Sequence, residues 1–475
     1  MSGLTKKRRT KIVCTLGPAC TDKVLHQLLE AGMDVARLNF SHGTREEHAA
    51  WIREVRQFSD SHAKPVAILQ DLAGPKMRLG ELAGGQINII KGQKLNLTTT
   101  PRPGQADEVG VDYPEIISET PVGVPILLGD GQIELLVEGK SANALQCQVL
   151  AGGVLRSHAG INFPSHSLSI PAFTAKDRED LRFGVEMGVD FVALSYVRQA
   201  QDVMAVKEFL KDLGADIPII AKIEKHEALN HLEEILHEAD GLMVARGDLG
   251  LEVALEKVPF IQKQLIAAAN RVGKPVITAT QMLLSMVNQP RPTRAEATDV
   301  ANAILDGTDA VMLSEETAMG QYPLAAVRFL DHISRVTEAH FPYARWLSER
   351  AHLSRQEIPE AISYAAAEMA RDLDAAAILT STDYGGTARL ISRFRPRAPI
   401  IGITRRPETW RRLTLSWGVF TLLVPHLRDT DHMVQVMKEE TLKAGWLKPG
   451  KKVVITAGTP LGIRGTTNLI KADVV

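Results

Sequence analysis

Three strand-like apolar runs in the middle of the chain each end in reactive side chains. These side chains are Lys222 with Glu224, Asp248 and Thr280. Because side chains alternate between the two faces of a strand, Lys222 and Glu224 point to the same side. One ammonium group, two carboxylates and a hydroxyl at neighbouring strand ends can hold a divalent metal and an anion. We therefore predict a catalytic site at these strand ends.

Short β-branched runs alternate with amphipathic segments over most of the chain. The predicted strands are 11–16, 35–40, 66–72, 190–197, 217–224, 241–248, 275–281 and 309–314. Helical periodicity follows most of them, at 45–59, 176–187, 200–213, 256–272 and 293–305. Eight β/α units predict a closed parallel (β/α)8 TIM barrel with its helices outside.

The third predicted strand is followed by a different pattern. From 73 to 169 the chain shows short alternating runs, and Asp130-Gly131 between two of them is typical of a hairpin turn. We predict a small β-barrel domain inserted in the third βα loop. Such loops lie at the active face of a barrel, so the insert is placed to act as a lid.

A second αβ pattern begins after residue 344. A helix is expected at 359–373 and strands at 376–379, 399–404 and 452–456. The predicted domains are therefore the barrel at 1–72 and 170–344, the insert at 73–169, and a C-terminal α/β domain at 345–475.

The composition of the 475 residues, with 45% apolar and 23% charged, is ordinary for a globular protein. A formal net charge of −1 gives no basis for a nucleic-acid or membrane-surface partner. Three cysteines without a CxxC pair fit a reducing compartment, and no segment reaches membrane-span length, so we predict a cytoplasmic protein. The basic run Lys6-Lys7-Arg8-Arg9 is expected to be a solvated terminus.

Polar side chains gather at the predicted C-terminal strand ends, which meet at one mouth of a barrel. They are Arg37, Asn39, Ser41, His42, Asp71, Ser195, Lys222, Glu224, Asp248, Thr280, Ser314 and Glu315. Glu224 and Asp248 are oxygen donors that suit Mg²⁺ or Mn²⁺, and a Glu224–Lys222 salt bridge is the alternative. Arg37 either clamps a phosphate or carboxylate, or is a stabilising surface arginine.

Other metal and nucleotide motifs are missing from the sequence. His226, His231 and His237 are spaced by five and six residues, which does not place two of them on one helix face, so we expect them to be exposed. The chain has no HExxH, no GxxxxGK[ST], and no GxGxxG after a strand.

The residues of the predicted mouth resemble the pyruvate kinase family, and the resemblance extends from end to end. It rests on six segments in register, at 9–19 (RTKIVCTLGPA), 36–43 (ARLNFSHG), 243–250 (MVARGDLG), 278–283 (TATQML), 290–296 (PRPTRAE) and 306–317. The resemblance implies a barrel with a lid and a regulatory C-terminal domain, assembled as a homotetramer. It implies Mg²⁺-dependent phosphoryl transfer from phosphoenolpyruvate to ADP, giving pyruvate and ATP in the final step of glycolysis.

The resemblance also implies a role for each residue of the mouth. Lys222 would stabilise the transferring phosphoryl group, and Arg37 would hold the phosphate. Glu224 and Asp248 would hold the divalent ion. The substrate carboxylate would contact Thr280 and the backbone of Gly247 and Asp248. The nucleotide side would be lined by Asn39, Phe40, Ser41, His42 and Arg78, and the catalytic set would be Arg37, Arg78, Ser195, Lys222 and Thr280.

The chain departs from the family pattern at a monovalent-cation pocket. Many members bind K⁺ with residues equivalent to Asn39, Ser41, Asp71 and Leu72, and carry glutamate where this chain has Lys76. Lysine at this position resembles the K⁺-independent branch of the family. We therefore predict that the Lys76 ammonium replaces the cation and that K⁺ is not required.

The lid departs from the pattern as well. Ala159 stands where lysine is common in the family, and Ser169 stands where aspartate is frequent. The lid contacts to the nucleotide are therefore less defined by the resemblance than the barrel site.

A loop rich in hydroxyls and glycines precedes a predicted helix in the C-terminal domain. Its residues are Thr380, Ser381, Thr382, Gly385, Gly386 and Thr387. Such a loop can cradle a phosphate, and the family uses it for phosphorylated effectors, so a sugar phosphate or nucleoside monophosphate is one hypothesis. The other is an ordinary helix cap, because Asp383 would repel an anion unless it turns away.

Two rival functions remain open at this point. A Mg²⁺-dependent barrel aldolase that handles pyruvate enolates would share Glu224 and Asp248 but would not need Arg37, Asn39 and the lid. A non-catalytic metabolite sensor would use only the C-terminal loop. ADP-dependent formation of pyruvate discriminates among the three.

Overall fold

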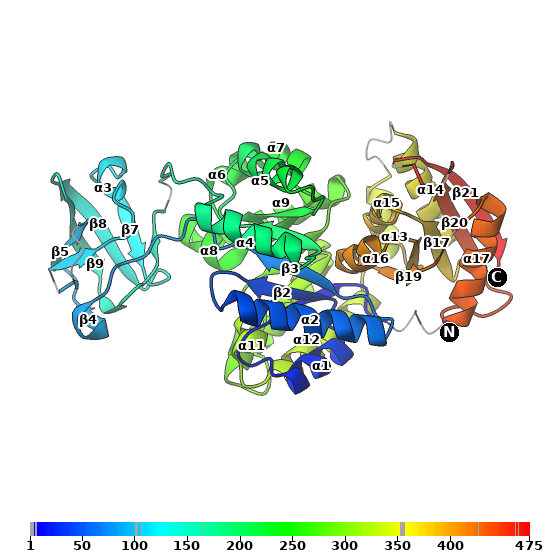
Figure 1. Ribbon diagram of the computed structural model, residues 1–475, viewed down its shortest axis with the longest axis horizontal. Helices are drawn as coiled ribbons and strands as arrows, with labels where there is room; N and C mark the ends of the chain where they lie inside the picture. The colour runs from blue at the N-terminus through cyan, green and yellow to red at the C-terminus, as the bar shows by residue number, and fades with distance from the viewer. Residues whose placement is uncertain are drawn as a thin grey trace.

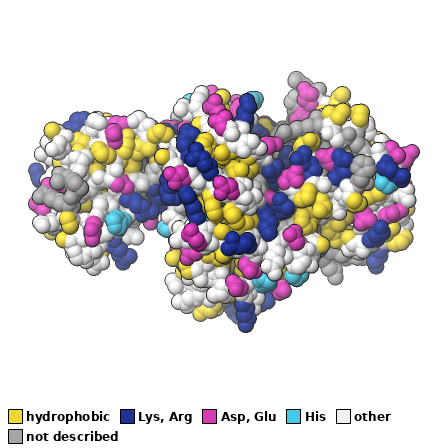
Figure 2. Space-filling view, viewed as in Figure 1, with side chains coloured by type: hydrophobic (Ala, Val, Ile, Leu, Met, Phe, Trp, Pro, Cys, Tyr) yellow, Lys and Arg dark blue, Asp and Glu magenta, His cyan; other side chains and the backbone are white. Residues whose placement is uncertain are grey.

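The computed structural model describes residues 4, 7–99, 103–105, 107–164, 166–351, 357–425, 427–460, 462–463 and 465–475. The barrel occupies the middle of an elongated molecule, with the inserted strands at one end and the C-terminal sheet at the other (Figure 1). Charged side chains of both signs are spread over the face seen in Figure 2.

Eight parallel strands close into a barrel in the order β1-β16-β15-β14-β13-β12-β3-β2. They are β1 (Lys11–Thr15), β2 (Val35–Asn39), β3 (Ala67–Asp71), β12 (Phe191–Leu194), β13 (Ile219–Ile223), β14 (Gly241–Ala245), β15 (Val276–Ala279) and β16 (Ala310–Leu313). All eight predicted strands are confirmed. Nearly all their residues are buried, because helices cover the outer face and side chains fill the interior.

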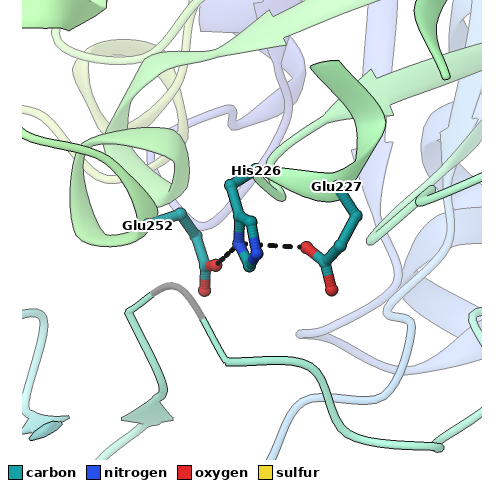
Figure 3. A group of neighbouring side chains, drawn as sticks. All are labelled: His226, Glu227 and Glu252. Carbon is teal, nitrogen blue, oxygen red and sulfur yellow. Dashed lines mark hydrogen bonds and ion pairs between the residues drawn. The ribbon is translucent and has the colours of Figure 1, made fainter. Parts of the chain in front are cut away.

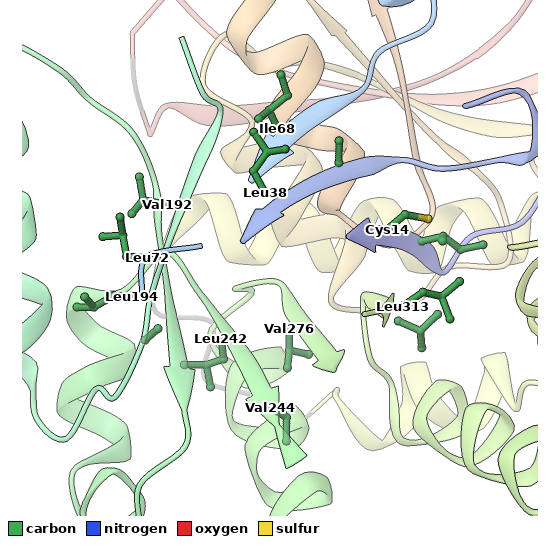
Figure 4. Packing of buried hydrophobic residues seen from close by; sticks show 14 of the residues in the cluster. Cys14, Leu38, Ile68, Leu72, Val192, Leu194, Leu242, Val244, Val276 and Leu313 are labelled. Atoms are coloured by element: carbon green, nitrogen blue, oxygen red, sulfur yellow. The ribbon is translucent and has the colours of Figure 1, made fainter. Parts of the chain in front are cut away.

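Helices pack around the outside of the barrel. The longer ones are α1 (Asp22–Ala31), α2 (Arg45–Ser61), α4 (Ala175–Glu186), α5 (Ala200–Asp212), α9 (Val258–Arg271), α10 (Arg294–Asp306) and α12 (Pro323–Ala339). Three of them begin with a capping box, in which Thr44, Thr174 or Thr293 exchanges hydrogen bonds with an acidic residue three positions later. The core between strands and helices includes Leu38 and Val192, which lie among the packed side chains of Figure 4.

The insert is made of two sheets. Six strands lie in the order β11-β7-β8-β9-β5-β6, and β10 pairs with β4. They are β4 (Gln86–Ile89), β5 (Lys94–Thr98), β6 (Glu108–Gly110), β7 (Pro125–Leu128), β8 (Ile133–Lys140), β9 (Ala144–Ala151), β10 (Gly153–Arg156) and β11 (Ile161–Asn162). Asp130 and Gly131 turn between β7 and β8 with φ of 56° and 81°, which confirms the predicted hairpin.

The segment before β4 links the two edges of the six-stranded sheet. The Leu79 N–H donates to the Ala159 carbonyl at 2.9 Å on the β11 side, and the Gly80 N–H donates to the Gly110 carbonyl of β6 at 2.8 Å. These bridges join β11 and β6, as the predicted small β-barrel requires.

The C-terminal region holds a five-stranded sheet in the order β19-β18-β17-β20-β21. Its strands are β17 (Ala377–Ser381), β18 (Ile400–Thr404), β19 (Val419–Leu423), β20 (Lys452–Gly458) and β21 (Thr467–Val474), of which β21 is antiparallel to β20. The helices are α14 (Ile358–Asp372), α15 (Gly386–Ser392), α16 (Pro407–Arg412) and α17 (Thr430–Lys443). Leu415, from the turn after α16, belongs to the apolar cluster inside the barrel. The two regions are therefore packed together.

The prediction of a solvated basic terminus is wrong for its last two residues. Arg8 is buried and forms ion pairs with Asp34 at 2.9 Å and Asp331 at 3.0 Å. The Arg9 side chain donates to the carbonyl of Arg397 at 2.6 Å, which ties the barrel to the C-terminal region. Long-range partners decide this burial, and local charge density does not reveal them. Lys6 lies outside the described residues.

Candidate active site at the barrel mouth

The predicted site residues converge on the C-terminal mouth of the barrel. Arg37 lies in β2, and Asp71 is the last residue of β3. Ser195, Glu224 and Thr280 follow the ends of β12, β13 and β15.

Asp248 differs from its prediction as a strand-end residue. β14 stops at Ala245, and Asp248 lies in the first turn of α8 (Arg246–Glu252). The carboxylate therefore approaches the mouth from the start of a short helix. The charge of Asp248 acts on Glu224, because it contributes to a raised pKa there.

The Lys222 ammonium is held by three groups. Its Nζ lies 3.0 Å from Asp71 Oδ1, 2.9 Å from Glu224 Oε1 and 2.6 Å from Ser195 Oγ. The Lys222–Glu224 salt bridge of the alternative hypothesis is therefore present, but it is one contact of a larger network. Ser195 in turn donates to the carbonyl of Leu72 at 2.7 Å, which fixes its hydroxyl beside the ammonium.

Arg37 shares Asp71 with Lys222. Arg37 Nε and Nη2 each lie 2.7 Å from Asp71 Oδ2, and Nη1 donates to Thr15 Oγ1 at 2.8 Å. With 8% of its surface exposed, Arg37 is not the surface arginine of the alternative hypothesis. Thr15 is a positioning residue that the sequence analysis missed, because only the barrel closure brings β1 beside β2.

The buried charges shift one another's pKa values. Burial raises the pKa of Glu224 to about 7, with Lys222 opposing and Asp248 adding to the rise. Burial would lower the pKa of Lys222, but the charges of Asp71 and Glu224 outweigh it and raise that pKa. Burial would raise the pKa of Asp71, yet Lys222 and Arg37 lower it. Lys222 therefore stays cationic and, beside the Arg37 guanidinium, can attract an anion.

Thr280 is held in a strained backbone conformation. Its φ is 64° and that of Gln281 is 54°, both in the left-handed region. The backbone N–H of Gly247 donates to Thr280 Oγ1 at 2.9 Å, and this hydroxyl donates to the carbonyl of Ala279 at 2.7 Å. The strained residue Thr280 therefore lies beside the Gly247 amide, which is predicted to contact the substrate.

Arg246 clamps this strained turn. Its Nη2 donates to the Thr280 carbonyl at 2.6 Å and its Nε to the Ala279 carbonyl at 3.1 Å. An ion pair of 2.7 Å with Asp299 of α10 orients the guanidinium. Neither Arg246 nor Asp299 was predicted from the sequence, although Arg246 precedes Gly247 directly in the family segment.

Glu224 and Asp248 fit a divalent metal by their chemistry. Both offer carboxylate oxygens, which are the donors that Mg²⁺ and Mn²⁺ take in proteins. The N–H of Tyr196 donates to Glu224 Oε2 at 2.7 Å, which orients the carboxylate. Tyr196 itself has a φ of 56°, so this backbone turn is also strained.

On the predicted nucleotide side, several cations lie around His42. Burial lowers the pKa of His42, and the charges of Lys76, Arg78 and Arg37 lower it further, so these groups share one region. Arg78 Nη1 donates to the His158 carbonyl of the insert at 2.9 Å. Phe40 is one of the predicted nucleotide-side residues, and its ring is buried and stacks on His48 with centroids 4.2 Å apart.

Some acceptors of the predicted monovalent-cation pocket are already used by donors of the chain itself. Asn39 Oδ1 accepts from the Ser41 N–H at 3.2 Å, and the Leu72 carbonyl accepts from Ser195. The Asp71 carboxylate is shared by Lys222 and Arg37. Lys76 is exposed beside this region.

Comparison with known proteins assigns the chain to a family. The family described as "Pyruvate kinase, barrel domain" matches residues 7–327. "Pyruvate kinase, alpha/beta domain" matches residues 360–472. The chain belongs to the pyruvate kinase family. As a member of this family it is a phosphotransferase.

Several curated pyruvate kinases align along nearly the whole chain. The pyruvate kinase of Geobacillus stearothermophilus is 48% identical over 474 residues, which cover 99% of this chain and 81% of the relative. Pyruvate kinase 2 of Synechocystis sp. is 48% identical over 473 residues, covering 98% and 79%. The pyruvate kinase of Sporosarcina psychrophila is 45% identical over 472 residues, covering 98% and 80%.

A second group of possible metal ligands lies next to the pyruvate kinase barrel site. His226 Nδ1 lies 3.1 Å from both Glu227 Oε2 and Glu252 Oε2 (Figure 3). The expectation of an exposed histidine is wrong for His226, whose side chain is only 25% exposed. Lys225 also pairs with Glu252, and Ser167 donates to Glu227 Oε1, whereas Glu227 Oε2 has no hydrogen-bond donor among the described residues.

The predicted effector loop borders a cavity of about 800 Å³, part of it open to solvent. Ser381, Thr382, Gly386 and Thr387 line it, whereas Thr380 and Gly385 are not among its described lining residues. Asp383 forms an ion pair with Arg405, so its charge is neutralised and does not face the cavity alone.

Within the described part of this pyruvate kinase relative, no helix is both long and apolar enough to cross a membrane.

Proposed function

We propose that the chain transfers the phosphoryl group of phosphoenolpyruvate to ADP and yields pyruvate and ATP. The observation that carries this proposal is the pair of buried cations, Lys222 and Arg37, held by Asp71 at the barrel mouth. Phosphoryl transfer needs positioning and charge neutralisation more than covalent catalysis. Two relatives that align along nearly the whole chain are named as pyruvate kinases, and this supports the same reaction.

In this proposal each group of the mouth has one task. Lys222 neutralises the phosphoryl group as it moves, and Arg37 binds the phosphate before transfer. The Gly247 N–H, the Asp248 N–H and Thr280 orient the carboxylate. Arg78 and the residues Asn39 to His42 face the nucleotide, with Phe40 contributing backbone only.

Glu224 and Asp248 would hold the divalent ion, Mg²⁺ or Mn²⁺. When bound, the ion supplies positive charge beside the substrate carboxylate and the phosphoryl oxygens. Ser195 and Tyr196 would keep Lys222 and Glu224 in place. We further propose that a water near Thr280 protonates the enolate, so Thr280→Val would slow enolate protonation more than phosphoryl transfer.

A coupled assay tests the proposed reaction. Pyruvate formation from phosphoenolpyruvate with Mg²⁺ should require ADP. Pyruvate formation or aldol cleavage that is independent of ADP would favour the barrel aldolase. An intact, folded protein without either activity would favour the metabolite sensor.

We propose that K⁺ is not required, because the chain's own donors already use some acceptors of the pocket and Lys76 stands beside it. Rates in tetramethylammonium salts should match those in potassium salts. Lys76→Glu should create a K⁺ requirement, as a carboxylate there would need a cation. A strong K⁺ requirement in the unmodified protein would contradict the proposal.

We also propose allosteric control by a sugar phosphate or nucleoside monophosphate at the C-terminal cavity. The space of about 800 Å³ and the hydroxyls of Ser381, Thr382 and Thr387 support a phosphate-bearing ligand. We propose that the chain assembles as a homotetramer in the cytoplasm and catalyses the final step of glycolysis there. The proposed domains are the barrel at 1–72 and 170–344, the insert at 73–169 and the C-terminal domain at 345–475. We propose no nucleic-acid partner.

A further inference from the structure

A set of four aspartates lies at the end of the barrel opposite the mouth, where the strands begin. Each aspartate directly precedes one strand and accepts a hydrogen bond from a backbone N–H at the start of the neighbouring strand. The pairs are Asp34 with Ile12 at 2.8 Å, Asp190 with Ile68 at 2.8 Å, Asp240 with Ile219 at 2.9 Å, and Asp309 with Val276 at 3.1 Å. Each carboxylate therefore ties two adjacent strands together where they begin.

Asp190 is a member of this set that also joins the barrel to the C-terminal region. It is 1% exposed, and its two oxygens take donors from different regions. Oδ2 accepts from the Ile68 N–H and from Arg56 Nη2, each at 2.8 Å and both within the barrel. Oδ1 accepts from Arg411 Nε of α16 at 2.8 Å. Loss of Arg411 would leave this buried oxygen without a donor among the described residues, which costs free energy.

Arg411 has a fixed base on its own side of the junction. α16 lies on the side of the C-terminal region that is next to the barrel (Figure 1). Thr409 Oγ1 donates to the Asp383 carbonyl at 2.7 Å. The Trp410 carbonyl accepts from Thr421 Oγ1 at 3.0 Å. An ion pair between two mobile, exposed side chains contributes little, whereas Arg411 extends from an anchored helix to a buried carboxylate.

The two strands that Asp190 ties together both end beside Lys222. β3 and β12 are paired, with Ala193 opposite Asp71. Asp71 ends β3 and lies 3.0 Å from Lys222 Nζ, and Ser195 follows β12 and lies 2.6 Å from it. Because a strand is extended, a displacement at Asp190 is carried along about 17 Å of backbone to Ser195. The position of the Lys222 ammonium therefore depends on how these strands begin.

We propose that Arg411 is a positioning residue for the barrel site. Through Asp190 it fixes the start of β3 and β12. These strands in turn hold Asp71 and Ser195 around Lys222. The C-terminal region thereby contributes to the geometry of the mouth without touching the substrate. The kinetic part of this inference rests on the proposed phosphoryl transfer, whereas the effect on the strands does not.

Hydrogen exchange of the full chain, measured by mass spectrometry, tests the strands whatever reaction the protein catalyses. In Arg411→Met, amide exchange over 191–197 should be several-fold faster than in the wild type, because the start of β12 is released. Exchange over 241–245, the β14 strand, should not change. Equal acceleration in both strands would mean general destabilisation and would overturn the proposal, as would unchanged exchange over 191–197.

Arg412→Met is the matched control. Arg412 follows Arg411 on α16 and also crosses to the barrel, but its Nη2 donates to the carbonyl of Asp216 in an exposed loop at 2.7 Å. The control removes the same charge from the same helix and leaves Asp190 in place. Its exchange over 191–197 should match the wild type, and exchange as fast as in Arg411→Met would contradict the role of Asp190.

Steady-state kinetics tests the link to the reaction. Arg411→Met should lower kcat about tenfold with little change in KM, because a misplaced Lys222 acts mainly on the transition state. Arg411→Lys should restore part of kcat, since an ammonium can donate to Asp190. A purely structural role would lower Tm and leave kcat of the folded protein unchanged, and equal kcat in Arg411→Met and Arg412→Met would likewise overturn the proposal.

Two further outcomes keep the test decisive. If Arg411→Met does not fold, Arg411→Lys decides, and wild-type kcat together with wild-type exchange in that variant would contradict the positioning role. If the wild type forms no pyruvate, the proposed function fails, and the exchange measurement alone decides whether Arg411 fixes the strands.

Discussion

At the barrel mouth, Lys222 and Arg37 are buried and held by carboxylates at short distances, whereas the predicted effector loop of the C-terminal region faces about 800 Å³ of space. The mouth is built from the ends of rigid strands, and its charges fix one another. The C-terminal cavity is built from loop hydroxyls and glycines, and its one acidic loop residue, Asp383, is neutralised by Arg405. This difference suggests that chemistry is preorganised at the mouth, while the C-terminal cavity can adapt to a ligand.

The largest effect is expected from removing the Lys222 ammonium. Lys222→Met should lower kcat about 10³-fold, since an electrostatic stabiliser of this kind acts mainly in the transition state. Steady-state kinetics should show the loss in kcat more than in KM. Lys207→Met, on the partly exposed side of α5, is the control and should retain activity. A loss of less than tenfold would mean that the mouth is not preorganised around this cation.

A smaller loss is expected when the clamp on the strained turn is removed. Arg246→Met should lower kcat/KM about 10²-fold, because displacement of the Gly247 and Thr280 groups by about an ångström is costly. Arg246 acts through the turn, so Arg246→Lys should restore part of the activity. Arg328→Met on the exposed side of α12 controls for the loss of one arginine. Equal activity in Arg246→Met and Arg328→Met would refute the positioning role.

Metal binding at the mouth should depend on pH. The pKa of Glu224 is raised to about 7, so its carboxyl takes up a proton as pH falls through 7, and that proton competes with the metal. Mn²⁺ affinity of the free protein, measured by titration calorimetry, should therefore be about tenfold weaker at pH 6 than at pH 8. In Glu227→Gln the same dependence should remain. If it vanished there, the His226 group of Figure 3 would be the metal site instead.

The raised pKa of Glu224 also makes the stability of the folded protein depend on pH. The folded protein holds the Glu224 proton up to about pH 7, whereas the unfolded chain releases it near the ordinary glutamate pKa of 4.5. The contribution of this group to folding is therefore fully present below pH 4.5 and is lost as pH rises through 7.

The smallest effect is expected at the C-terminal cavity. Sugar monophosphates should change the half-saturating concentration of phosphoenolpyruvate a few-fold, a coupling of ordinary size. Thr382→Glu should abolish this response by placing a like charge against the phosphate. Ser348→Glu adds the same charge at an exposed hydroxyl residue outside the cavity and should keep the response. If both variants respond like the wild type, the loop is an ordinary helix cap.

Periodicity and the six family segments were sufficient to predict the eight strands and most of the mouth. Short β-branched runs alternate with amphipathic segments, and eight such β/α units predict the barrel. The position of Asp248 on α8 was not predictable in this way, because an apolar run gives no marker for where the strand stops. The burial of the Phe40 ring and of Arg8 depends on partners such as His48 and Asp331, which only the tertiary fold brings near.

The contacts of Asp71 also depend on the tertiary fold and could not be predicted from the sequence. Sequence placed Asp71 in a cation pocket by resemblance, whereas its carboxylate bridges Lys222 and Arg37 from two different strands. Closure of the barrel, through the β3–β12 and β2–β3 pairs, creates that bridge. A sequence pattern therefore predicts which residues lie at strand ends, but it does not predict the distances between them.

The most direct test of the account follows the phosphoryl group itself. Phosphoenolpyruvate carrying a labelled phosphate would be mixed with excess enzyme, ADP and Mg²⁺, and the products of one turnover would be quenched and separated. The account predicts that the label appears in ATP, one molecule for each pyruvate formed. Pyruvate that appears without labelled ATP, or no pyruvate from a folded protein, would contradict it.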